Sequence, residues 1–129
     1  MNLSTQEIEN VAKLEPLKRY EYFVKKIADF EELWTIVNKT GDIALSDVEE
    51  NILISFWTAE PFIKSNLNGG WENCTPFKLS LDDLEETIIP LITKNNYLVN
   101  VFPVNGKSGF IVSLNEFIRD LNEELEKYE

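Results

Sequence analysis

Histidine is absent from the 129-residue chain, and cysteine occurs once, at Cys74. Without histidine, catalysis by a Ser-His-Asp or Cys-His arrangement is excluded, and so is a histidine ligand to zinc. A single thiol can form neither a disulfide within the chain nor a multi-cysteine metal site. A lone cysteine behind an N-terminus that lacks a basic, apolar leader is typical of a reducing compartment. We therefore expect a cytoplasmic protein with no metal and no other cofactor.

Basic residues and long apolar runs are also scarce. The chain has 12 lysines and arginines against 23 aspartates and glutamates, which leaves a net charge of −11. A chain without a basic face is poorly suited to contact phosphates, so we expect no nucleic-acid partner. The most apolar run, residues 88–92, contains Pro90 and is too short to cross a bilayer, so we expect no membrane partner. The acidic surface either keeps the protein soluble or meets a basic partner.

Apolar and aromatic residues, in contrast, make up 43% and 12% of the chain. A chain of this length and composition can bury enough surface to fold as one unit without disulfides. No linker rich in proline, glycine or serine divides it. We predict a helical lead-in over residues 1–14 and a single α+β domain over residues 15–129.

Hydrophobic periodicity, capping residues and turn residues predict both helices and strands. Helices are predicted over residues 5–14, 16–30 and 58–68, from residue 81 onward with a kink at Pro90, and after the capping residue Ser113. Strands are predicted over residues 34–37, 43–45, 52–57, 77–79, 97–104 and 110–112. Short turns predict an antiparallel meander for the first three strands and a hairpin for the last two. We expect an α+β fold with a mostly antiparallel sheet of about five or six strands, covered by helices, and with helices at both ends.

No residue pattern predicts catalysis. Asn105-Gly106-Lys107-Ser108 is similar to the end of a phosphate-binding loop, but Val101 stands where that motif needs glycine. We therefore predict no catalytic residue and a protein that is not an enzyme. Two further readings stay open: an enzyme that uses Glu60 or Glu72 with Lys78, and an acidic mimic of nucleic acid.

Aromatic residues are the best candidates for binding. We assign Tyr22, Trp34, Trp57 and Trp71 as tentative binding residues, with Tyr22 on the polar, exposed side of its helix. Aromatic side chains dominate the centres of protein interfaces and also line small-molecule pockets. Our first hypothesis is a non-enzymatic protein-interaction module, regulatory or immunity-like, with an unidentified protein partner. The alternative is a small-molecule-binding domain whose aromatic pocket is lined by the three tryptophans.

The order of these residues resembles the bacterial domain-of-unknown-function family numbered 2750. The most specific block is Arg19-Tyr20-Glu21-Tyr22-Phe23-Val24-Lys25-Lys26-Ile27-Ala28-Asp29 followed by Trp34. The similarity continues through Trp57, the Trp71 loop, Leu81-Asp82-Asp83-Leu84, Leu91, Val99-Asn100-Val101-Phe102-Pro103 and Ser113, up to the tail that runs from Leu121 to Tyr128. The resemblance implies a small cytoplasmic α+β domain. It implies no activity, cofactor or catalytic residue.

Overall fold

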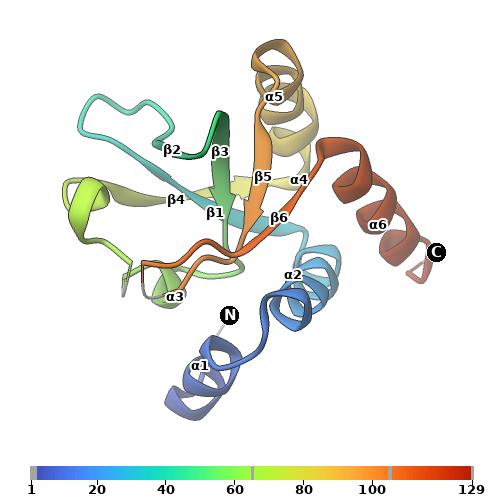
Figure 1. Ribbon diagram of the computed structural model, residues 1–129. Coiled ribbons are helices and arrows are strands. Elements are labelled where there is room, and N and C mark those ends of the chain that lie inside the picture. Colours follow the sequence, from blue (N-terminus) through green and yellow to red (C-terminus); the bar gives the residue numbers. More distant parts are fainter. Residues whose placement is uncertain (1–2, 65, 105, 129) are drawn as a thin grey trace.

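The computed structural model describes residues 3–64, 66–104 and 106–128, and it confirms the α+β class (Figure 1). The helices are α1 (Thr5–Ala12), α2 (Pro16–Phe30), α3 (Glu60–Lys64), α4 (Leu81–Asp83), α5 (Ile89–Asn95) and α6 (Leu114–Glu126), with a 3-10 turn η1 (Gly69–Trp71) and a π-helical turn η2 (Leu84–Ile88). The strands are β1 (Glu32–Val37), β2 (Leu45–Val48), β3 (Asn51–Phe56), β4 (Thr75–Ser80), β5 (Leu98–Val101) and β6 (Phe110–Val112).

The strands form two sheets. One sheet has the order β2-β3-β5-β6, and the other is the pair β1-β4. Strands β3 and β5 run parallel, and the other paired strands are antiparallel. The predicted three-stranded meander is therefore wrong at its first strand. Strand β1 pairs with the distant β4 and meets the larger sheet through bridges at Trp34–Trp57 and Val37–Ile43.

The core lies between one face of the larger sheet and helices α2 and α6. The register aligns Ile54 with Val99 and Val112, and all three side chains are buried. Phe117 of α6 packs on Phe56 of β3 and on Phe23 of α2, at 6.3 and 5.9 Å between ring centroids. Figure 1 shows α2 and α6 side by side near β6. Burial of these apolar stripes holds both amphipathic helices in place.

The lead-in packs on the rest of the chain. Val11 of α1 is 4% exposed and belongs to the core. The Glu7 carboxylate accepts a hydrogen bond from the Tyr22 hydroxyl at 2.9 Å and lies 3.9 Å from the Lys26 ammonium. These contacts join α1 to α2.

Several predicted elements differ in extent from the observed ones, and three of the differences have a local cause or bear on the cavity. Near Pro90, where a kink is expected, the helix changes from the π-helical turn η2 to α5, which has the proline in its first turn; proline has no N–H for the Glu86 carbonyl. The helix predicted over residues 58–68 is confined to α3 and is followed by η1. The strand predicted over residues 97–104 ends at Val101, because Phe102 has a left-handed φ of 63°.

Candidate functional site

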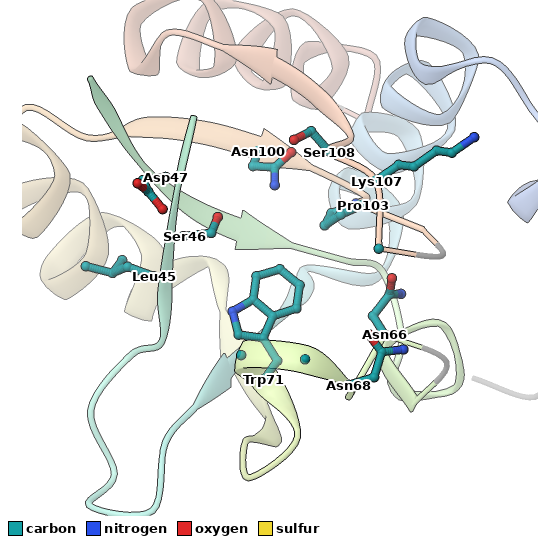
Figure 2. Close-up of a pocket in the computed structure, with 13 residues that line it drawn as sticks. Leu45, Ser46, Asp47, Asn66, Asn68, Trp71, Asn100, Pro103, Lys107 and Ser108 are labelled. Carbon is teal, nitrogen blue, oxygen red and sulfur yellow. The ribbon is translucent and has the colours of Figure 1, made fainter. Parts of the chain in front are cut away.

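A cavity of about 450 Å³ opens between β2, the η1 turn and the chain that follows β5 (Figure 2). Its lining residues come from three segments: Leu45, Ser46 and Asp47 in β2; Asn66, Asn68, Gly69, Gly70 and Trp71 around η1; and Asn100, Pro103, Gly106, Lys107 and Ser108 in and after β5. Amides, hydroxyls and glycines predominate. The only ionisable side chains among these described residues are Asp47 and Lys107, and both are exposed.

A buried polar pair forms one part of the wall. Asn100 is 2% exposed, and its Nδ2 donates to Oγ of the fully buried Ser55 at 3.1 Å. The backbone N–H of Gly109 donates to Oδ1 of Asn100 at 2.8 Å. Buried polar atoms need such partners, because an unmade hydrogen bond costs more free energy than a made one gains. Both ends of the Asn100 amide are therefore occupied, and its orientation is fixed.

The segment after β5 is held in an unusual conformation. Phe102 is fully buried with a φ of 63°, a region that aromatic side chains rarely occupy. Its N–H donates to the Phe56 carbonyl at 2.9 Å, and its carbonyl accepts from Nε of Arg19 at 3.1 Å. The indole N–H of Trp57 donates to the carbonyl of Pro103 at 2.9 Å. Arg19 and Trp57 therefore hold Pro103 in the cavity wall from behind.

Arg19 performs this task as a buried cation. It is 5% exposed, and its guanidinium also donates to the Leu14 carbonyl. Burial lowers the pKa of Arg19, and the nearby Glu15 carboxylate partly opposes that shift. The sequence block that suggested the family thus contains a residue that acts on the cavity through the backbone.

Trp71 forms the aromatic wall. Its ring is half-buried and meets the Trp57 ring edge to face, at 5.9 Å between centroids and an angle of 79°. In the view of Figure 2, the Trp71 indole lies between Ser46 on one side and Asn66 on the other. Because Trp57 is fully buried, it fixes the position of the Trp71 ring.

Asn66 brings a second buried amide to the cavity. It is 2% exposed, and its Nδ2 donates to the Phe62 carbonyl at 2.9 Å. Its Oδ1 accepts no hydrogen bond from any described residue. Asn66 therefore has a buried acceptor without a partner in the described part of the chain.

The tentative binding residues do not converge on one pocket. Trp71 lines the cavity, while Trp57 lies behind it and Trp34 meets Trp57 through two backbone hydrogen bonds of 2.8 Å. Tyr22 lies away from the cavity, with its ring against Phe102 and Phe62. The predicted exposure of Tyr22 is wrong: the residue is half-buried, and its hydroxyl donates a hydrogen bond to Glu7 of α1. Burial and this hydrogen bond raise the pKa of Tyr22.

Sequence reasoning missed the two buried asparagines. Asn100 had a usable signal, since it is the one strongly polar residue inside the apolar run of residues 97–104. Asn66 had none, because asparagine is ordinary in a turn-forming stretch such as Asn66-Leu67-Asn68-Gly69-Gly70.

Other chemistry has little support in the described residues. Within residues 3–64, 66–104 and 106–128, no group of three acidic, cysteine or histidine side chains gathers as a metal site needs. Cys74 is buried and does not line the cavity, and burial raises the pKa of its thiol. A raised pKa lowers the thiolate fraction and hence the nucleophilicity. Among the described helices, none has the length and apolar character needed to span a membrane.

Comparison with known families gives a match to a family model. The model described as "Protein of unknown function (DUF2750)" matches residues 20–121, from α2 into α6. That range includes all the described residues that line the cavity and leaves α1 outside. Comparison with curated proteins gives no match.

Proposed function

Because the chain belongs to the family of proteins of unknown function described as DUF2750, we propose a function from the cavity itself: a non-enzymatic module that binds a small polar molecule beside Trp71. This is the small-molecule alternative of the sequence analysis, with a different set of lining residues. We place the module in the cytoplasm, on the strength of its lone thiol.

The observation that carries the proposal is a cavity of about 450 Å³ with two buried amides, Asn66 and Asn100, and one aromatic wall. Small-molecule sites have this size and this combination of an aromatic wall with a few placed polar groups. A non-catalytic role is supported by the lining, in which the two ionisable side chains lie at the exposed rim. General acid–base catalysis needs such groups within hydrogen-bond reach of a held substrate.

The experiment is a thermal-shift screen of polar metabolites against the wild type and two variants at Gly70. An added Cβ at Gly70 meets no atom within 4 Å, and its φ lies outside the left-handed region. Gly70→Ala is therefore the matched control, and Gly70→Phe takes up part of the cavity. We expect a metabolite that raises the melting temperature of the wild type and of Gly70→Ala, and that has no effect on Gly70→Phe. Equal shifts in all three proteins would place binding elsewhere.

We propose protein interaction as the second candidate, in the regulatory or immunity-like sense of the sequence analysis. The observation that favours it is Leu45, an apolar residue that is 36% exposed and lines the cavity. A basic loop of a partner could place an apolar side chain there, and the net charge of −11 would favour its approach. The composition argues against nucleic-acid and membrane partners. The test is a co-purified protein that Gly70→Ala retains and Gly70→Phe loses.

A further inference from the structure

We propose that the groove between α6 and the helical segment α4–η2–α5 binds a basic amphipathic helix of a partner protein. The groove has a volume of about 310 Å³, and none of its described lining residues also lines the cavity beside Trp71. This binding is therefore separate from the proposed function. Figure 1 shows α4 and α5 next to α6.

Apolar side chains from both walls line the groove. Ile118, Leu121 and Leu125 of α6 follow one another at spacings of three and four residues, which places them on one face of the helix. Leu84 and Ile89, five residues apart, line the opposite wall. The π-helical turn η2 lies between them, and its wider i→i+5 hydrogen bonding brings both to the same side. Turns of this kind occur often at functional sites.

The fold leaves this apolar surface incompletely covered. Ile89, Ile118 and Leu125 are only half-buried. Ile118 does not pack against the core that the described residues form. From Ile118 to Leu125 the α6 wall extends over about two helical turns, or roughly 11 Å. A partner helix with apolar residues at a spacing of three and four positions can cover a wall of this length.

The walls of the groove also concentrate the acidic charge. Residues 81–95 and 114–126 carry nine acidic and two basic residues, whereas the whole chain has 23 and 12. Glu85 lines the groove, while the two basic residues, Lys94 and Arg119, do not. Lysines or arginines beside the apolar stripe of a partner are attracted by this charge. A second copy of this chain, with its net charge of −11, and an anionic membrane surface are repelled.

The helical walls favour a helical partner over an extended one. An extended peptide adds to the open edge of a sheet, where unpaired backbone groups can bind its own. Within α5 and α6 the backbone groups already bond to one another along the helix. A partner helix satisfies its own backbone in the same way, so only side chains have to meet in the groove.

The test uses the full-length protein and a fluorescein-labelled peptide of about 14 leucine and lysine residues, whose leucines recur every three or four positions. One control peptide has proline in place of two central leucines, and the other has glutamate in place of every lysine. Binding is followed by fluorescence anisotropy at low and at high sodium chloride. We expect the first peptide to bind at least about tenfold more tightly than either control, with an affinity that falls as salt is raised.

Two matched pairs of protein variants locate the binding. Ile118→Arg and Ile111→Arg add the same charge at an apolar residue, but Ile118 lines the groove and Ile111 is exposed on β6. We expect Ile118→Arg to weaken binding at least about tenfold, and Ile111→Arg less than about twofold. Glu85→Gln and Glu9→Gln each remove an exposed carboxylate, and of the two only Glu85 lines the groove. We expect about threefold weaker binding for Glu85→Gln and no change for Glu9→Gln.

Several outcomes would overturn the inference. Equal weakening within each pair would mean that the peptide follows overall charge, and equal binding of the proline peptide would mean that no helix is recognised. Failure of the basic peptide to bind the wild type is equally negative. A dimer in sedimentation that only Ile118→Arg disrupts would make the occupant a second copy. The glutamate pair stays decisive if Ile118→Arg does not fold, and the cavity is tested separately by the Gly70 screen.

Discussion

Arg19 shows how a single charged residue can be structural inside a small domain. A buried guanidinium normally costs free energy, because it loses its water. Here its donors reach two backbone carbonyls, at Phe102 and Leu14, that have left the regular hydrogen-bond ladders. The cation thus stabilises a backbone segment that its own φ angle strains.

We predict that Arg19→Met lowers the free energy of unfolding by about 2–4 kcal/mol, because the buried Phe102 carbonyl and the part-buried Leu14 carbonyl both lose their donor. Arg119→Met is the matched control. Arg119 is exposed, and its ion pair among the described residues is with its neighbour Asp120, at 3.4 Å, so its loss should cost less than about 1 kcal/mol. Urea denaturation of the two variants measures the difference. Equal costs for both would show that Arg19 does not support the Phe102 segment.

At the scale of elements, the β5–β6 hairpin has one position, Gly109, with no room for a side chain. A Cβ at Gly109 would lie 1.9 Å from the Val101 carbonyl oxygen, which belongs to the backbone and cannot move aside. The Gly109 N–H also fixes Asn100. Hairpin closure and cavity wall therefore depend on the same glycine.

We predict that Gly109→Ala destabilises the protein by more than about 2 kcal/mol, because the methyl group forces β5 and β6 apart. Gly70→Ala, with open space around its Cβ, should change stability by less than about 1 kcal/mol. Thermal denaturation of the two variants checks the contrast. A mild effect at Gly109 would mean that the hairpin can open there without disturbing the core.

Helices were more predictable from the sequence than the pairing of strands. The apolar stripe of α6 and its cap Ser113 act locally, so sequence spacing reveals them. A strand pattern shows which side chains are buried but not which strand lies alongside. The β1–β4 pair and the parallel β3–β5 pair could therefore not be predicted from the sequence. The same difference between local and long-range information applies to the residues of the cavity. Trp71 stood out by type, whereas the role of Asn66 depends on long-range packing.

Tyr20 ties α2 to α6, and its titration gives a pH prediction. The hydroxyl of this buried residue donates to Oδ2 of Asp120 at 2.6 Å. Burial, and then this hydrogen bond, raises the pKa of Tyr20 above its ordinary value of 10.0. The folded state therefore keeps the proton to a higher pH than the unfolded state does. The stability that this proton supplies is present below about pH 10 and is lost as the pH rises above it.

We predict that Tyr20→Phe is about 1 kcal/mol less stable than the wild type near pH 8, because the hydrogen bond is lost. Near pH 11 the difference should vanish or reverse. At that pH the unfolded wild type releases the Tyr20 proton, which favours unfolding, and Tyr20→Phe has no such proton to release. Urea denaturation at both pH values tests this. A difference that stays constant would show that Tyr20 ionises equally in the folded and unfolded states.

At the scale of the whole molecule, repulsion among acidic side chains outweighs attraction in the ion pairs. The described residues form local or exposed pairs such as Lys18–Glu21 and Lys64–Glu60, which contribute little to stability. The chain nevertheless carries 23 acidic residues against 12 basic ones. Compaction brings these like charges together, so the fold is opposed by a long-range term that salt can screen.

We therefore predict that raising sodium chloride from about 10 mM to about 0.5 M increases the melting temperature by about 3–6 °C, because the screening length falls from about 30 Å to a few ångströms. Salt also strengthens apolar burial, so the control must separate the two effects. Glu85, Glu86 and Glu123 are exposed and form no ion pair with a described residue, and replacing all three with lysine roughly halves the net charge. That variant should melt higher than the wild type at low salt and respond to salt about half as strongly. If the melting temperatures of both proteins respond equally to salt, the salt effect comes from apolar burial. The acidic side chains would then not destabilise the fold, and the acidic surface could serve a basic partner without lowering stability.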